Sequence, residues 1–177
     1  MQLTLGFVED RPLLLLDVDG VLNPYGGECP AGFTEHALFP DEIGPVRVCV
    51  DHGEWIAELA GAYEVVWATA WGEEANRLLA PLLGLPRLPV VPFPQVPFSA
   101  DLKVPAIDAL AGDRPAAWID DMLGPAAYDW AARRAAPTLL LPVDPLVGWN
   151  RQIVERALEW AVSEGRAPTT RSPDSGP

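Results

Sequence analysis

The segment LLLLDVDG, residues 13–20, constrains the fold more than any other part of the chain. Four consecutive leucines need apolar neighbours on both sides, and a strand buried on both faces is typical of a parallel sheet covered by helices. Asp17 and Asp19 follow this strand at once, with Gly20 behind them. Carboxylates so close together repel each other, so their position at a strand end predicts a site that holds a positive charge.

The rest of the chain alternates between short apolar runs and helical patterns. We expect five strands, at residues 11–18, 62–70, 88–93, 114–121 and 136–143. Helical spacing and terminal residues predict helices at residues 51–62, 71–84, 99–112, 124–136 and 148–165. This order predicts an α/β fold, a Rossmann-like three-layer sandwich with a mostly parallel five-stranded sheet. The strands of such a sheet end along one edge, where ligands bind.

A single domain accounts for residues 1–165 of the 177 in the chain. Residues 23–50 interrupt the alternation and are rich in Gly and Pro, so we expect a β-hairpin flap over the site edge in place of a cap domain. Residues 166–177 have no apolar face and are predicted to be a disordered tail.

Charge and hydropathy exclude some functions. The net charge of −13 argues against tight, nonspecific nucleic-acid binding, which needs a basic face. No apolar run reaches the roughly 18 residues that span a bilayer, so we expect no membrane partner. The start of the chain lacks the pattern of a signal peptide, and a cytoplasmic protein is the expectation.

Polar side chains follow several of the expected strands where each one ends. They are Asp17 and Asp19 after the first strand, Thr69 at the end of the second, and Asp120 and Asp121 at the end of the fourth. Lys103, the only lysine among twelve basic residues, lies at the start of the helix after the third strand. All of these side chains would meet at one edge of the sheet.

This set of residues suits phosphate chemistry. Asp17 and Asp121 can share a Mg²⁺ ion through oxygen ligands, which would relieve the crowding of carboxylates. Lys103 and the Thr69 hydroxyl can offset the charge of a phosphate. Asp17 can attack phosphorus to form an aspartyl-phosphate, and Asp19 can protonate the leaving oxygen and then activate water.

The same residues resemble the motifs of the haloacid dehalogenase-like phosphatases. LLLLDVDGVLN resembles the first motif, VVWATA the second, Lys103 the third and AWIDD the fourth, in the family's order over residues 13–121. The resemblance implies a capless, Mg²⁺-dependent phosphatase that hydrolyses a phosphomonoester. It implies Asp17 as nucleophile, Asp19 as acid and base, and Thr69 and Lys103 as phosphate-binding residues. The implied metal ligands are Asp17, the Asp19 backbone carbonyl and the pair Asp120 and Asp121, of which Asp121 is the expected direct ligand.

A narrower resemblance, carried by DVDGVLNP, WATAWGEEAN, LGLP and WIDD followed by PTLLL, links the chain to a branch of this superfamily associated with RNA repair. It implies nucleotide or nucleic-acid ends as substrates, beside small phosphorylated metabolites. An arginine cluster, Arg133 and Arg134, would have to face the crevice for strong activity on a polynucleotide. Tyr25, Asn23 and His36 in the flap, and Trp71, are further candidates for substrate contact.

The sequence argues against three competing interpretations and leaves two others open. A calcium-binding EF-hand loop starting at Asp17 would need an oxygen ligand and a glycine where the chain has Val21 and Leu22. A receiver domain would carry its acidic pair before the lysine, whereas Asp120 and Asp121 come after Lys103. A dehalogenase has no use for an acid at Asp19. A phosphotransferase on the same scaffold, and a non-catalytic regulatory or binding protein that keeps the fold, stay open as alternatives.

Overall fold

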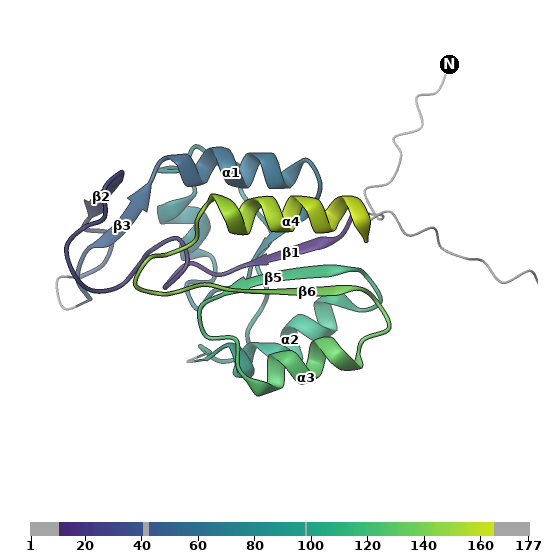
Figure 1. The fold of residues 1–177 in the computed structure, drawn as a ribbon. Coiled ribbons are helices and arrows are strands. Elements are labelled where there is room, and N and C mark those ends of the chain that lie inside the picture. The colour runs from purple at the N-terminus through teal and green to yellow at the C-terminus, as the bar shows by residue number, and fades with distance from the viewer. Residues whose placement is uncertain (1–10, 41–42, 98, 165–177) are drawn as a thin grey trace, which may run out of the picture.

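The computed structural model describes residues 11–40, 43–97 and 99–164, so the predicted tail at 166–177 lies outside the described residues. Its centre is a parallel sheet in the order β4-β1-β5-β6 (Figure 1). The strands are β1 (Leu13–Leu16), β4 (Glu64–Trp67), β5 (Ala116–Asp120) and β6 (Thr138–Pro142). The prediction of an α/β fold with a mostly parallel sheet is confirmed.

Four helices cover the two faces of this sheet. In Figure 1, α1 (Asp51–Ala60) and α4 (Arg151–Ser163) lie on one side, and α2 (Ala100–Ala111) and α3 (Pro125–Arg133) lie on the other. The leucines of β1 alternate between the two layers, because Leu14 and Leu16 join one apolar cluster and Leu13 and Leu15 the other. All four are essentially buried, which explains the unbroken apolar run. No helix in the described part of the chain is long and apolar enough to cross a membrane.

The prediction of a fifth strand at residues 88–93 is wrong. This segment makes one isolated bridge to the sheet, in which Trp67 N donates to Pro89 O at 2.9 Å and Val91 N donates to Trp67 O at 2.8 Å. Pro89 and Pro92 have no amide hydrogen, so the ladder cannot extend in either direction. The sheet therefore has four strands with a proline-rich segment beside β4.

The predicted helix at residues 71–84 is also different in the structure. A short π-helix, η2 (Ala75–Leu79), is flanked by turns, and Ala80 N donates to Ala75 O at 2.9 Å. Pro81 follows and cannot donate to the preceding turn. The Asn76 side chain bonds both backbone groups of Leu88, which fixes the start of the proline-rich segment.

The flap region forms the predicted hairpin, an antiparallel pair of β2 (Phe33–His36) and β3 (Val46–Cys49). In Figure 1 the pair lies apart from the main sheet, at the side toward which β1 runs. Its root is packed rather than loose, because buried His52 on α1 contacts the rings of Phe33, Trp55 and Trp149. The hairpin is thus a fixed extension of the edge where the strands end, which we call the carboxyl edge.

Candidate active site at the carboxyl edge

The chain turns sharply as soon as β1 ends. Asp17 N still donates to Ile119 O of β5 at 3.1 Å, and the amides of the next turn then converge on one acceptor, the Val18 carbonyl oxygen. Their donors are Val21, Leu22 and Asn23. Gly20 lies within this turn at φ +73°, a left-handed conformation that favours glycine. The turn directs the Asp17 and Asp19 side chains into different surroundings.

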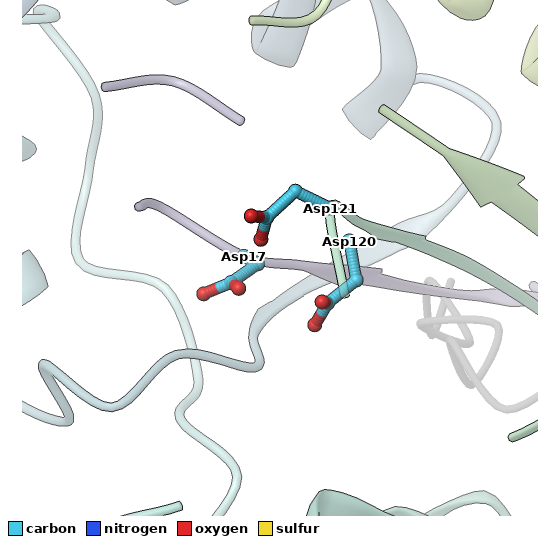
Figure 2. Close-up of side chains that lie close together, drawn as sticks. All are labelled: Asp17, Asp120 and Asp121. Carbon is cyan, nitrogen blue, oxygen red and sulfur yellow. The ribbon is translucent and has the colours of Figure 1, made fainter. Parts of the chain in front are cut away.

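Three carboxylates meet where β1 and β5 end (Figure 2). Asp17, Asp120 and Asp121 each offer one oxygen, and these oxygens lie within 4.8 Å of one another. Gly20 makes this possible, because a β-carbon at its position would overlap the Asp121 carboxylate. Asp17 and Asp120 are buried and Asp121 is half-buried, so little water reaches the cluster. Such an oxygen-only, negatively charged set can hold a metal ion.

Lys103 brings a positive charge to the cluster. Its Nζ atom lies 2.8 Å from Asp17 Oδ2 and 2.7 Å from Asp120 Oδ2, and its side chain is 5% exposed. The ammonium comes from the first turns of α2, which starts after the proline-rich segment. One lysine compensates at most one of the three acids, so a net negative charge remains in the pocket.

The remaining negative charge helps to raise the pKa values of two of the acids. Burial, followed by the nearby Asp120, raises the pKa of Asp17 to about 7 despite the attraction of Lys103. Burial and Asp120 also raise the pKa of Asp121 to about 6. For Lys103, the attraction of Asp17 and Asp120 outweighs burial, so its pKa is raised and it stays charged. A cation bound among the acids would restore their ionised forms.

The two neighbouring acids of β5 have different partners. Asp120 accepts from Lys103 through Oδ2 and from Met122 N through Oδ1 at 2.9 Å, so both of its oxygens are occupied. Asp121 has no ion-pair partner in the described part of the chain. Asp120 thus orients Lys103, whereas the Asp121 oxygens are not taken up by an ion pair within the described residues.

Asp19 stands apart from the other three acids. Its Oδ1 accepts from Asn23 Nδ2 at 2.9 Å and its Oδ2 accepts from Trp71 Nε1 at 2.8 Å. Two neutral donors therefore hold a carboxylate that still lines the same pocket as Asp17. The sequence marked Asn23 and Trp71 as candidates for substrate contact, but their hydrogen bonds to Asp19 were not predicted.

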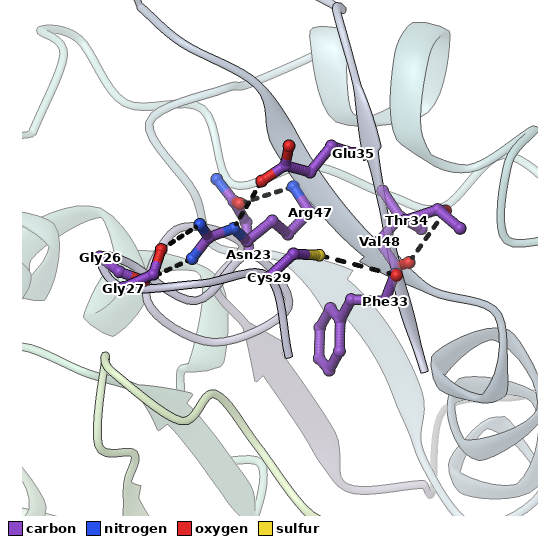
Figure 3. A network of polar contacts seen from close by, with 9 residues as sticks. All are labelled: Asn23, Gly26, Gly27, Cys29, Phe33, Thr34, Glu35, Arg47 and Val48. Atoms are coloured by element: carbon purple, nitrogen blue, oxygen red, sulfur yellow. Dashed lines mark hydrogen bonds and ion pairs between the residues drawn. The ribbon is translucent and has the colours of Figure 1, made fainter. Parts of the chain in front are cut away.

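The hairpin is connected to Asp19 through Asn23. The Asn23 side chain accepts from Arg47 N of β3 at 2.9 Å while it donates to Asp19. Figure 3 shows the Arg47 guanidinium directed at the carbonyls of Gly26 and Gly27 and at Glu35. The loop after β1 and the hairpin are thus joined in one polar network that ends on Asp19.

The acidic pocket itself is small, with a volume of about 110 Å³. That is the space of roughly three or four waters at about 30 Å³ each, which suits a phosphate-sized group. Tyr25 lines it from the loop after β1, and burial and Asp19 raise the pKa of its hydroxyl, which stays protonated. His36, another flap candidate, instead bonds Thr34 within the hairpin.

Thr69 does not line the acidic pocket. It is buried at the end of β4, accepts from Trp71 N at 3.3 Å, and lines a second cavity next to the acids. Ala70, the next residue, lines both cavities. The predicted set therefore divides: Lys103 and the four aspartates line one pocket, and Thr69 lies at its border.

The two arginines considered for polynucleotide contact lie elsewhere. Arg133 ends α3, Arg134 follows it, and both line a cavity with Asp108 and Asp113 at the opposite edge of the sheet. Arg134 stacks over the Trp130 ring at 4.8 Å and donates to backbone carbonyls. The condition that we set for strong activity on a polynucleotide is therefore not met by these two arginines, because α3 runs antiparallel to the strands and its last turn lies away from their carboxyl ends.

The chain matches no protein-family model and no curated protein. The central arrangement of the site is Lys103, buried between Asp17 and Asp120. Asp121 lies beside them and has no ion-pair partner among the residues that the structure describes.

Proposed function

We propose that the chain is a Mg²⁺-dependent phosphatase of the haloacid dehalogenase-like type, which hydrolyses phosphomonoesters through an aspartyl-phosphate on Asp17. The observation that carries the proposal is the meeting of Asp17, Lys103 and the pair Asp120 and Asp121 in one small pocket. The motif resemblance over residues 13–121, which rests on the same residues, also supports it. Burying this much charge lowers the stability of the fold, and such a cluster is typical of a functional site.

The first half of the reaction is transfer of the phosphoryl group. A carboxylate oxygen of Asp17 attacks phosphorus, and the bond from phosphorus to the ester oxygen breaks. Asp19, in its protonated form, gives its proton to the leaving oxygen, which departs as a neutral alcohol. Lys103 favours the ionised form of Asp17 and compensates charge on the transferring group. Asn23 and Trp71 keep the Asp19 carboxyl in place.

The second half is hydrolysis of the aspartyl-phosphate. Asp19, now a carboxylate, takes a proton from water, and that water attacks phosphorus. The bond between phosphorus and Asp17 breaks, which releases inorganic phosphate and restores both carboxyl groups. The oxygen donors of Asp17 and Asp121 and the backbone carbonyl of Asp19 would hold Mg²⁺, which supplies charge compensation for the phosphoryl oxygens.

Phosphate release from a panel of phosphomonoesters tests the proposal, with Mg²⁺ or with EDTA. We expect release that needs Mg²⁺ and that falls at least ~1000-fold in Asp17→Asn. Asp113→Asn, which changes an exposed acid at the opposite edge, is the matched control and should keep full activity. Acid-quenched mass spectrometry of the wild type during turnover should show one added phosphoryl group, which Asp17→Asn should lack.

A folded wild-type chain that binds Mg²⁺ and releases phosphate from no compound would overturn the proposal in favour of a binding or regulatory protein. Transfer of the phosphoryl group to an added alcohol at the expense of water would show a phosphotransferase on the same scaffold.

A further inference from the structure

A second cavity adjoins the acidic pocket. Its volume is about 290 Å³, and Ala70 and Pro97 line both cavities. Because Ala70 and Pro97 border both cavities, the two lie side by side, and the larger space is the nearest one for the rest of a molecule whose phosphate lies beside Asp17. We call this larger space the side cavity.

The wall of the side cavity is mainly apolar. The proline-rich segment beside β4 contributes Val90, Val91, Phe93 and Val96. Proline residues in this segment prevent it from joining the sheet beyond one bridge, so its side chains are free to line a cavity. An apolar wall next to a polar reacting centre is the usual arrangement of a site for a small organic molecule.

The charges around the side cavity do not favour an anion. Glu73 is the only charged residue among its described lining residues, and it pairs with Arg87 at 2.9 Å. Lys103 is already bound by Asp17 and Asp120. A second phosphate, as in a nucleotide chain, would therefore find no cation among the described lining residues, and Arg87 is already paired with Glu73.

The size of the cavity sets the size of the group. A closed apolar cavity of roughly 150 Å³ suffices to bind benzene. The side cavity has about twice that volume, so it accommodates one ring with a substituent. A chain of nucleotides would have to continue past exposed Val96 and Gln95 without basic contacts from these residues.

We propose that the side cavity binds the alcohol part of the substrate and selects a phosphomonoester whose leaving group is uncharged, mainly apolar and about the size of a substituted ring. The inference rests on the proposed function and names its substrate class. It disfavours nucleic-acid ends, the substrates implied by the narrower family resemblance.

Three phosphomonoesters with leaving alcohols of similar acidity separate the possibilities: methyl, benzyl and 4-carboxybenzyl phosphate. We expect kcat/KM for benzyl phosphate to exceed that for methyl phosphate by at least ~30-fold, because a ring fills the apolar cavity. The added carboxylate should lower kcat/KM by at least ~10-fold relative to benzyl phosphate. A 5′-phosphorylated dinucleotide is assayed as a fourth substrate and represents nucleic-acid ends, the substrate class that the inference disfavours.

A matched pair of variants locates the effect. Val96→Asp puts a charge on the cavity wall, and Val162→Asp puts the same charge on α4, at a valine of similar exposure. Val96→Asp should reduce the ratio of kcat/KM for benzyl phosphate to kcat/KM for methyl phosphate by at least ~10-fold. Val162→Asp should leave the ratio unchanged.

Binding of two phosphonates, which cannot be hydrolysed, separates this inference from the proposed function. Calorimetry with Mg²⁺ should show tighter binding of benzylphosphonate than of methylphosphonate, and Val96→Asp should remove the difference. That result without any phosphate release would support the cavity and overturn the phosphatase. Phosphate release with equal kcat/KM for all three esters, or a preference for the dinucleotide, would overturn the inference and leave the phosphatase intact.

Discussion

The two edges of the central sheet handle charge in opposite ways. At the edge where the strands begin, which we call the amino edge, Arg114 donates to Glu64 and to Arg11 O. Arg134 there donates to Thr138 and to two carbonyls. At the carboxyl edge, three aspartates lie close together and one lysine pairs with two of them, Asp17 and Asp120. The two arginines of the amino edge thus find acceptors within the chain, whereas the carboxyl edge keeps a negative excess.

This contrast separates structural charge from functional charge. A charged residue that serves folding is surrounded by groups that satisfy it, as Arg134 is. Asp121 is half-buried among other acids and has no ion-pair partner in the described residues, which makes it a candidate for binding a cation. Matched substitutions at the two edges test whether the difference is functional.

The largest expected difference comes from removing one cation at each edge. Lys103→Met leaves Asp17 and Asp120 buried without their partner, and should cost about 3–5 kcal/mol of unfolding free energy. Arg114→Met removes a pair that is about one-third exposed, and should cost no more than about 1 kcal/mol. Urea denaturation measures both. Phosphatase activity should fall at least ~100-fold in Lys103→Met only, and equal losses of activity would contradict the contrast.

Two glycines with positive φ give the next comparison. Gly20→Ala would force the Asp121 carboxylate to move, whereas a β-carbon at Gly112 on the amino edge meets nothing within 4 Å. Both changes strain the backbone by about 1 kcal/mol or more, so both should lower stability. Only Gly20→Ala should lower kcat/KM, by roughly 100-fold, with weaker Mg²⁺ binding. Normal Mg²⁺ affinity in Gly20→Ala would show that Asp121 is not a ligand.

The third test uses pH and metal. The folded-state pKa values of Asp17, about 7, and Asp121, about 6, lie above the ordinary value of 3.8, so the metal-free folded chain holds these protons more tightly than the unfolded chain. Their contribution to stability is complete below about pH 4 and is lost as the pH rises toward 7. Mg²⁺ binds the ionised acids, and at 100 times its Kd adds about 2.7 kcal/mol.

Thermal unfolding at pH 5 and pH 8 checks this prediction. Mg²⁺ should raise Tm by roughly 5–10 °C at pH 8 and by much less at pH 5. Asp121→Asn should reduce the shift at pH 8. A shift that is as large at pH 5 as at pH 8 would mean that the ion binds away from Asp17 and Asp121.

The smallest expected effect concerns two indole donors. Trp71 donates to Asp19 at the carboxyl edge, and Trp130 donates to Asp108 toward the amino edge, each at 2.8 Å. Trp71→Phe should lower kcat about 10-fold with little change in KM, because Asp19 loses one of the two donors that hold its side chain in place. Trp130→Phe should leave kcat unchanged. Equal kcat values in the two variants would exclude a role of Trp71 in positioning Asp19.

Much of the site was predictable because strand ends in a parallel sheet share one edge. The apolar runs before Asp17 and Asp120 locate two strand ends directly, and their neighbours in the sheet bring these acids together. The position of Lys103 was predictable by the same argument, because it lies in the first turn of the helix that leads back from the carboxyl edge to the next strand. Side-chain direction was not, because spacing alone does not reveal that Asn23 and Trp71 bond Asp19 or that Thr69 lines the side cavity.

The errors have physical causes that the sequence partly contains. Residues 88–93 are apolar, but Pro89 and Pro92 lack the amide hydrogens that a strand within a sheet needs. The position of Arg133 and Arg134 follows from topology, since a crossover helix ends at the amino edge. Within the π-helix at Ala75–Leu79, the Asn76 side chain bonds the Leu88 backbone. A local sequence pattern does not predict such a contact between residues twelve positions apart.

The proline-rich segment beside β4 has a consequence for association between molecules. The outer strand of an open sheet exposes backbone groups that can pair with a strand of another molecule. Here the segment that covers β4 carries Pro89, Pro92 and Pro94, so it cannot present a regular row of amide donors. This flank of the sheet is therefore closed to edge-to-edge aggregation, even in a concentrated solution of the folded chain.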